Sequence, residues 1–207
     1  MENETYKIVF LGDSNVGKTA ILNRYCLDIF EEESTPTVGF QYKIKHININ
    51  GKNIRLLIWD TAGSEKYRAL TMHYYRKVDG AFFVYDVNDV DTFENIDKFW
   101  FEQLQQNTDS LHYEVIIVGN KTDIRDLSNP EKVVSTEQGK ELAQKHSSLF
   151  IETSAKTGSF VGEAFVELVS RIIENREQME EEEKEQTDLI DLKKVTEPEQ
   201  KGNGCFC

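Results

Sequence analysis

One stretch of eight residues, Gly12–Thr19, constrains the fold of this chain more than any other. It reads Gly-Asp-Ser-Asn-Val-Gly-Lys-Thr and fits G-x-x-x-x-G-K-[ST], the pattern of a phosphate-binding loop. Its glycines let the backbone curl around an anion, and a helix that begins at its end directs a positive dipole end at that anion. An apolar run at 8–11 precedes it and a helix-like segment at 20–25 follows. This context disfavours the alternative, a glycine-rich turn with a chance Lys-Thr pair.

Two further positions fit the same chemistry. Lys18 supplies a mobile positive charge for the outer phosphates of a polyphosphate, and the Thr19 hydroxyl suits Mg²⁺. The tetrad Asp60-Thr61-Ala62-Gly63 follows an apolar run at 56–59, so its carboxylate lies at a strand end and can hold the ion. Gly63 leaves a backbone N–H accessible to a terminal phosphate. Alone such a tetrad is usually a turn, but after a phosphate loop it predicts a second element of the site.

The order of the apolar segments predicts the fold class. Apolar or alternating runs indicate six strands, at 6–11, 41–49, 54–59, 81–85, 115–118 and 149–151. Helix-period segments lie between most of them, at 19–27, 67–76, 92–107, 136–145 and 161–176. We therefore expect an α/β fold with a six-stranded, mostly parallel sheet and about five helices on its two faces. Asn50-Gly51 is a strong hairpin signal, so one antiparallel pair should form an edge.

Length and charge limit the function classes. The 207 residues suit one domain plus a tail, and the formal charge of −13 argues against a nucleic-acid surface. The start is acidic and no apolar run is long enough to span a bilayer, so we expect a protein made and kept in the cytosol. Cys26 fits a helix interior, while Cys205 and Cys207 close the chain, which excludes a disulfide framework. The four histidines lack metal-ligand spacing.

The end of the chain differs from the rest in composition. Residues 174–207 contain eleven acidic and five basic side chains and few apolar ones. Such a segment cannot bury enough apolar surface to order itself. We expect a nucleotide-binding domain at 1–176 and a flexible acidic tether at 177–207.

A third motif predicts which base is bound. Asn120-Lys121-Thr122-Asp123 follows an apolar strand. A carboxylate at position 123 accepts hydrogen bonds from the N1–H and exocyclic amine of guanine, whereas adenine presents a bare acceptor there. Lys121 can cover the base and Asn120 can brace the loops. Ser154-Ala155-Lys156, which alone reads as an ordinary loop, can supply the Ala155 N–H to the guanine oxygen.

At family spacing, these motifs resemble the guanine-nucleotide motifs of the Ras-like small GTPases. The segments at 59–63, 74–76 and 83–86 and the terminal Cys205-Phe206-Cys207 are similar to the Rab branch in particular. The resemblance covers residues 5–175 and the last three. It implies the phosphate-loop small GTPase fold, with GTP or GDP and Mg²⁺ as ligands and slow hydrolysis of GTP to GDP and phosphate.

The resemblance also assigns roles residue by residue. It implies catalytic roles for Lys18, Thr37, Gly63 and Ser64, and a Mg²⁺ site at Thr19, Thr37 and Asp60. The nucleotide-binding set that it implies is Ser14, Asn15, Val16, Gly17, Lys18, Thr19, Ala20, Phe30, Thr37, Gly63, Asn120, Lys121, Asp123, Ser154, Ala155 and Lys156. GTP would order residues 31–40 and 61–75 and hydrolysis would release them, which makes a switch.

Two positions depart from the family pattern. Asn15 replaces a common glycine, but asparagine tolerates a left-handed backbone, so we expect the loop to form. Ser64 replaces the glutamine that orients the attacking water. Because a serine side chain is shorter and lacks the amide's paired donor and acceptor, we expect slower intrinsic hydrolysis. Activating proteins of the Rab family can supply Arg and Gln in trans, so hydrolysis in that complex can persist.

The resemblance finally predicts partners and location. Effectors would bind an aromatic surface at Tyr42, Trp59 and Tyr74, although core packing is the simpler interpretation of these rings. An exchange factor, a GTPase-activating protein, a prenylation escort and a GDP-dissociation inhibitor complete the expected partners of a monomer. Two prenyl groups, on Cys205 and Cys207, would anchor it on the cytoplasmic face of an intracellular membrane, because one lipid binds only reversibly and the acidic tail adds no attraction.

Two other function classes remain open. A constitutively GTP-loaded binding module would keep nucleotide and effector binding while Ser64 removes useful hydrolysis. A phosphate-loop kinase or ATPase is disfavoured by the carboxylate at Asp123, since adenine cannot satisfy it.

Overall fold

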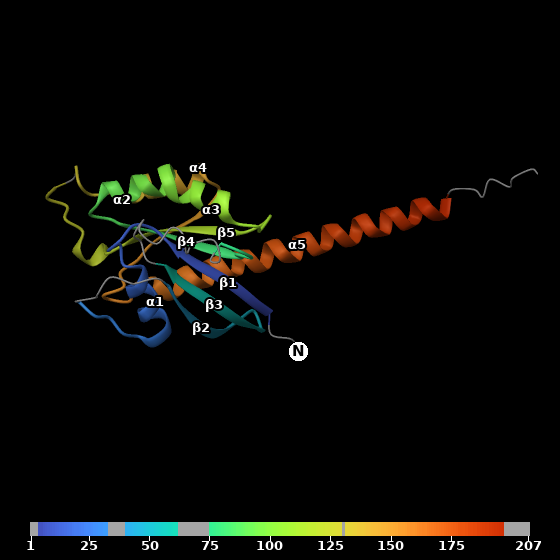
Figure 1. Ribbon diagram of the computed structural model, residues 1–207, viewed down its shortest axis with the longest axis horizontal. Helices are drawn as coiled ribbons and strands as arrows, with labels where there is room; N and C mark the ends of the chain where they lie inside the picture. The colour runs from blue at the N-terminus through green and yellow to red at the C-terminus, as the bar shows by residue number, and fades with distance from the viewer. Residues whose placement is uncertain (1–3, 33–39, 62–74, 130, 197–207) are drawn as a thin grey trace, which may run out of the picture. The chain divides into compact units, whose positions relative to one another are not determined.

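A computed structural model describes residues 4–32, 40–61, 75–129 and 131–196. The chain divides into two compact units, residues 1–172 and 173–207. The first unit contains a six-stranded sheet in the order β2-β3-β1-β4-β5-β6 (Figure 1). Its strands are β1 (Glu4–Leu11), β2 (Phe40–Ile49), β3 (Lys52–Thr61), β4 (Gly80–Asp86), β5 (Glu114–Asn120) and β6 (Leu149–Glu152).

The pairing of the strands confirms the predicted mixed sheet. β2 and β3 are antiparallel, and every other neighbouring pair of this sheet is parallel. Asn50 and Gly51 join β2 to β3 with φ angles of 52° and 81°. Two successive positive φ angles match the right-handed twist of a hairpin, which explains why this dipeptide was informative. The edge hairpin therefore forms where the sequence predicted it.

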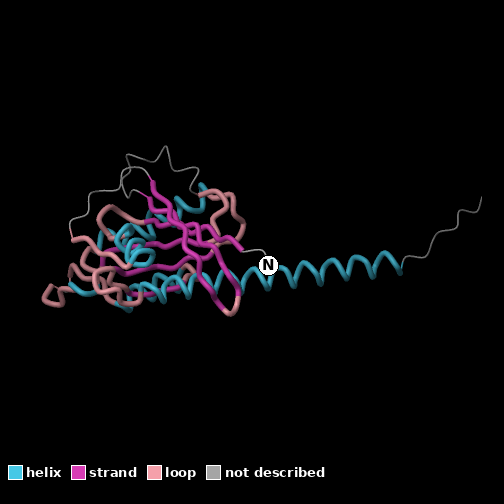
Figure 2. Tube along the Cα trace, turned by 90° about the horizontal axis from the view of Figure 1, so that it is seen from below, coloured by secondary structure: helices cyan, strands magenta, loops and turns pink. Residues whose placement is uncertain are grey.

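Helices cover both faces of the sheet. Figure 1 shows α2, α3 and α4 on one face and α1 with the beginning of α5 on the other, and Figure 2 shows the strands and helices from below. The described helices are α1 (Lys18–Leu27), α2 (Val90–Asn95), the π turn η2 (Ile96–Trp100), α3 (Phe101–Asn107), the 3₁₀ turn η3 (Thr122–Ile124), α4 (Thr136–Lys145) and α5 (Val161–Thr196). The segment α2-η2-α3 corresponds to the single helix predicted at 92–107.

The two covered faces explain the continuous apolar strands. Phe10 and Phe82 stack with ring centroids 4.5 Å apart, and Phe165 of α5 lies 4.6 Å from Phe82. On the other face Phe83, the next residue along β4, packs edge to face against Phe101 of α3 at 4.5 Å. Strands with apolar side chains on both faces can only be buried between two layers.

Two helix boundaries differ from the prediction. The helix expected at 67–76 lies mostly outside the described residues, and its last two positions, Tyr75 and Arg76, form a bend and a turn. The last helix was expected to end near Arg176 but continues to Thr196. The composition explains the extension, because Glu, Lys, Gln and Leu favour helix intrinsically and no proline occurs between residues 161 and 197. The domain boundary at 176/177 stays a prediction.

Candidate functional site

The loops that carry the predicted motifs meet at one edge of the sheet. β1, β3, β4, β5 and β6 run in the same direction, so the segments after their carboxyl ends lie side by side. After β1 the chain forms β2 and β3 on one side of β1, and then β4 on the other side of β1. The strand order therefore reverses at β1, which creates a topological switch point there. Ligands of open α/β sheets bind at such a point. The phosphate loop follows β1 there.

The backbone of the phosphate loop requires its two glycines. A Cβ on Gly12 (φ 138°) would lie 2.2 Å from the Val84 carbonyl oxygen, and one on Gly17 (φ 99°) would lie 2.2 Å from Asn120 Nδ2. Asn15 adopts a φ of 65°, the left-handed conformation that the sequence analysis expected asparagine to tolerate. α1 begins directly after Gly17. The loop therefore curls tightly and ends at a helix N-terminus, as anion binding requires.

Lys18 lies within this loop rather than extending into solvent. Its Nζ donates to the Gly12 carbonyl at 2.8 Å and to the Asp13 carbonyl at 2.6 Å, and the residue is 5% exposed. Burial lowers the pKa of Lys18 to about 8, while Asp60 and Asp13 act in the opposite direction. A buried ammonium without a full counter-charge is a site for an anion, because a phosphate would stabilise its protonated form.

Asp60 and Thr19 form the candidate metal site. Thr19 Oγ1 donates to Asp60 Oδ2 at 2.6 Å, and Asp60 is fully buried. Asp60 Oδ1 is also buried and has no hydrogen-bond partner within the described part of the chain. Burial raises the pKa of Asp60, against the effects of the Thr19 hydrogen bond and of Lys18. A hydroxyl beside an unsatisfied buried carboxylate oxygen fits a hard cation such as Mg²⁺, which takes oxygen ligands from protein, water and phosphate.

Asn120 connects three loops of the site. Its Nδ2 donates to the Val16 carbonyl at 2.9 Å, and its Oδ1 accepts from Thr153 Oγ1 at 3.1 Å and from the Ala155 N–H at 3.2 Å. The residue is 1% exposed. One buried amide thus ties the phosphate loop to the segments after β5 and β6, the bracing role that the sequence analysis considered for it. The Ala155 N–H, predicted to meet a guanine oxygen, is here a donor to Asn120.

The residues predicted to select the base lie beside this connection. Asp123 is exposed, and its Oδ1 accepts from the buried Ser154 hydroxyl at 2.6 Å. Lys121 has a φ of 69° and forms an ion pair with Asp86 at 2.8 Å. Because Asp123 is exposed here, an unpaired charge would carry a penalty only once a bound base shields it from water.

The remaining predicted residues are placed as follows. Phe30 is half-buried near the end of the first described segment. Lys156 is exposed and forms an ion pair with Glu32 at 2.6 Å. On the β2–β3 hairpin, Tyr42 is 55% exposed and lies 5.3 Å from the Trp59 ring, so these aromatics are partly available at the surface. The predicted residues that lie outside the described part of the chain are Thr37, Gly63, Ser64, Tyr74, Cys205 and Cys207.

Arg24 is a residue that the sequence analysis missed. It lies on α1, and its guanidinium donates to the Ala155 carbonyl and the Lys156 carbonyl, both at 2.9 Å. It also pairs with Asp28 at 2.7 Å. In the sequence an arginine at this position reads as a solvent-exposed helical side chain, and no motif marks its partners, which are backbone atoms 131 and 132 residues away.

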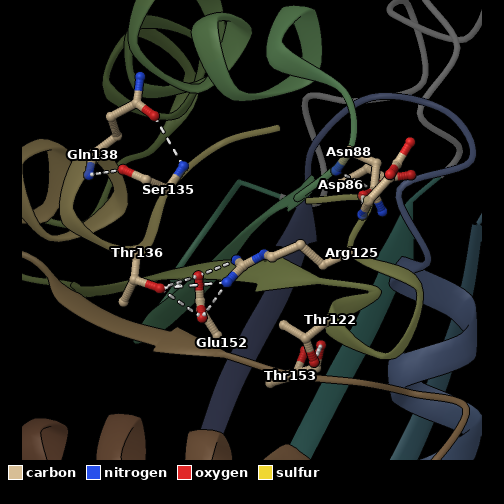
Figure 3. A network of polar contacts seen from close by, with 10 residues as sticks. Asp86, Asn88, Thr122, Arg125, Ser135, Thr136, Gln138, Glu152 and Thr153 are labelled. Atoms are coloured by element: carbon tan, nitrogen blue, oxygen red, sulfur yellow. Dashed lines mark hydrogen bonds and ion pairs between the residues drawn. The ribbon is translucent and has the colours of Figure 1, made fainter. Parts of the chain in front are cut away.

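A second missed network supports the base-binding segments from behind (Figure 3). Arg125 binds both carboxylate oxygens of Glu152, and Thr136 Oγ1 of α4 donates to the same carboxylate at 3.0 Å. Thr122 donates to the Thr153 carbonyl through both its N–H and its hydroxyl, at 3.2 and 3.1 Å. These contacts fix the segment after β5 against the segment after β6, where the predicted base-binding residues lie.

The fold and this edge together define a phosphate-loop protein of the guanine-nucleotide-binding type. A family model described as "Ras family" matches residues 7–174. Among curated relatives, Ras-related protein RABA1b of Arabidopsis thaliana is 42% identical over 84% of this chain and 79% of its own length. Rab11E of Lotus japonicus is 44% identical over 81% of this chain and 74% of its own length. Rab-1D of Dictyostelium discoideum is 38% identical over 98% of this chain and 95% of its own length.

The chain therefore belongs to the Ras family of small GTPases, in its Rab branch. Members of this family bind guanine nucleotides and hydrolyse GTP, so the protein is a GTPase. None of the described helices combines the length and apolarity needed to cross a bilayer.

Proposed function

We propose that the chain is a Rab-type switch of intracellular membrane traffic that cycles between GDP and GTP forms with slow intrinsic hydrolysis. The observation that carries the proposal is Asn120, whose buried amide joins the phosphate loop to both base-binding segments. A site built in this way is suited to one ligand that spans both parts, a nucleotide. The similarity to curated Rab proteins supports the assignment to traffic.

The proposed roles follow from the chemistry of each group. The N–H groups of Ser14–Ala20 bind the α- and β-phosphates, and Lys18 binds the β- and γ-phosphates. Thr19, Asp60 and Thr37 would hold Mg²⁺, and the bound ion would neutralise negative charge on the phosphates. Asp123 accepts the two guanine hydrogens while Ser154 fixes its orientation. Phe30, Lys121, Ala155 and Lys156 surround the base, and Asn120 holds these segments together.

Hydrolysis depends on how the attacking water is placed. In this proposal Lys18 stabilises the charge that develops on the phosphates, Thr37 would complete the Mg²⁺ site, and Gly63 binds the γ-phosphate. Ser64 stands at the position where the family has the glutamine that orients the water. A serine at this position orients the water less well than glutamine, so most of the acceleration would come from an activating protein. The intrinsic rate of such proteins is already on the order of 10⁻⁴ s⁻¹.

The second candidate is a constitutively GTP-loaded module, and Ser64 is the observation that favours it. Single-turnover hydrolysis with and without Rab-specific activating proteins separates the two. Acceleration by an activator supports the switch, and no acceleration by any activator supports the module. Both share the base site, and neither agrees with equal affinity for GTP and ATP.

We further propose that effectors bind the hairpin surface at Tyr42 and Trp59 together with Tyr74, and that Cys205 and Cys207 carry prenyl groups. The expected regulators are an exchange factor, an activating protein, a prenylation escort and a GDP-dissociation inhibitor. Membrane fractionation of a tagged chain before and after changing both cysteines to serine tests the anchor. Unchanged membrane association would contradict it.

The base assignment has a direct test in Asp123→Asn. The asparagine oxygen can still accept from N1–H, but the amide NH₂ then faces the exocyclic amine of guanine, donor against donor. Xanthine carries an oxygen at that position, which accepts from the amide NH₂. We expect the variant to lose GDP affinity and gain XDP affinity, measured by competition against a fluorescent nucleotide. Ser154→Ala is the matched control, because it frees the Asp123 carboxylate and the Thr157 N–H but leaves the carboxylate in place, so it should weaken GDP without favouring XDP. An unchanged preference in Asp123→Asn would remove the basis of the proposed function.

A further inference from the structure

Asp13, inside the phosphate loop, is bound by two side chains from a different layer of the fold. Trp100 Nε1 donates to its Oδ1 at 2.8 Å, and Asn95 Nδ2 donates to its Oδ2 at 2.6 Å. Each carboxylate oxygen thus has its own donor, and Trp100 is only 9% exposed. The roles proposed above use none of these three side chains.

The helical segment between β4 and β5 is shaped so that both donors reach the same carboxylate. Asn95 and Trp100 are five residues apart, and five residues of an α-helix advance by about 500°, which would leave them about 140° apart. Residues 96–100 instead form a π turn, in which the Phe101 N–H bonds to the Ile96 carbonyl. A five-residue turn brings such positions close to one face, and π turns occur frequently at functional sites.

The π turn is fixed on α4 as well. Asp97, within the turn, accepts from Lys145 Nζ at 2.6 Å and lies 2.6 Å from His146 Nε2, at the end of α4. The His146 ring stacks on Phe101, with centroids 3.7 Å apart. The donors to Asp13 therefore project from a segment that is held on both sides.

The charge of Asp13 explains why such a restraint is useful. The residue is part of the loop that is proposed to surround phosphates, and its carbonyl accepts from Lys18 Nζ at 2.6 Å. A carboxylate that turned toward bound phosphates would repel them. Two neutral N–H donors that occupy both carboxylate oxygens keep this charge on the side of α2 and η2.

We propose that Asn95 and Trp100 are positioning residues for the phosphate loop. Through Asp13 they hold a negative charge away from the nucleotide and keep the loop in its binding conformation. The inference rests on the proposed assignment of the loop to the phosphates. It predicts that loss of either donor speeds nucleotide release, and that removing the charge of Asp13 reverses much of that effect.

The experiment measures dissociation of fluorescent GDP from the full chain. Trp100→Phe and Asn95→Ala should each release GDP about ten-fold faster, since one hydrogen bond to a charged group is lost. Lys98→Met is the control from the same π turn and should release GDP at the wild-type rate, because the Lys98 side chain is exposed and its ion pair is with Glu94. Adding Asp13→Asn to Trp100→Phe should restore most of the slow release, whereas damage from lost core packing would not be reversed by a change of charge.

A spectroscopic measurement covers the case in which Trp100→Phe folds poorly. The chain has two tryptophans, so Trp59→Phe leaves Trp100 as the only one. Its emission should shift when GDP is removed with a chelator, and Asp13→Asn should abolish that shift. Wild-type release in the donor variants, no rescue by Asp13→Asn, or an emission insensitive to nucleotide would overturn the inference. Failure of the wild-type chain to bind GDP would instead overturn the proposed function.

Discussion

Arg24→Met tests whether a residue outside the nucleotide motifs controls how long the base is held. In the structure Arg24 donates to the carbonyls of Ala155 and Lys156 from α1. Methionine has a similar apolar stem and a comparable helix propensity, so α1 itself should persist. The variant removes the two charge-assisted hydrogen bonds to the 154–156 segment, and with them the Arg24 contacts to Asp28 within α1 and its C-cap. The segment keeps its contacts with Asn120 and Asp123.

The magnitude follows from the number of bonds and their exposure. Hydrogen bonds to charged groups are worth about 1.5–3 kcal/mol each when well buried. The Arg24 side chain is 19% exposed and the Lys156 backbone it contacts is at the surface, so water replaces part of the loss. We expect a net loss of about 1–2 kcal/mol in the bound state, which corresponds to about five- to thirty-fold faster GDP release.

The assay is release of fluorescent GDP, with inosine diphosphate as a second ligand. Inosine keeps the six-position oxygen that the 154–156 segment is proposed to contact and lacks the amine that Asp123 is proposed to contact. Arg24→Met should therefore weaken both ligands by the same factor, whereas Asp123→Asn should change their ratio. Arg171→Met is the matched control, because Arg171 is half-exposed and its ion pair with Glu114 is 3.8 Å long.

Two results would refute this reasoning. If Arg24→Met and Arg171→Met released GDP equally fast, the two carbonyl contacts would have no role in retention. If Arg24→Met altered the ratio between GDP and inosine diphosphate, the effect would reach Asp123 rather than the 154–156 segment.

Three further outcomes are expected. Gly17→Ala should lower GDP affinity roughly a hundred-fold in a titration, since its φ of 99° is costly for alanine and the new Cβ would displace Asn120; wild-type affinity would contradict the geometry. Lys145 and His146 lower the pKa of the Asp97 carboxyl below its ordinary value of 3.8. The stabilisation of the fold by the Asp97 carboxylate is therefore fully present above pH 3.8 and is lost as the pH falls through the lowered pKa. Urea unfolding should thus show Asp97→Asn destabilised at pH 7 but not near pH 2. Ser64→Gln should raise single-turnover hydrolysis about ten-fold, and an unchanged rate would show that position 64 does not limit it.

The sequence was most informative at positions where the backbone geometry accepts only one or two residue types. Gly12 and Gly17 are required by positive φ angles and close approaches, and Asn50-Gly51 forms the predicted hairpin. The pattern of the apolar residues predicted all six strands, because strands covered on both faces are apolar throughout and the edge strand β2 alternates apolar and polar residues. These features are local, so a single sequence reveals them.

The supports of the site could not be predicted in the same way. Arg24 donates hydrogen bonds to backbone carbonyls, and Glu152 accepts hydrogen bonds from an arginine 27 residues earlier in the chain. Asp13 accepts hydrogen bonds from side chains more than 80 residues later. Such pairs have no fixed spacing in the sequence, and their partners are identified only when the sheet brings the loops together. The extent of α5 was mispredicted for another reason, because lack of burial was taken as lack of order.

Asn120 has a consequence for how the nucleotide leaves. The same amide group contacts the backbone of the phosphate loop and the backbone after β6, so disturbing either contact weakens the other. A regulator need not displace both halves of the ligand. Displacing either the phosphate loop or the segment after β6 would also free the other segment from Asn120. The base, sugar and phosphates would then dissociate in a single concerted event.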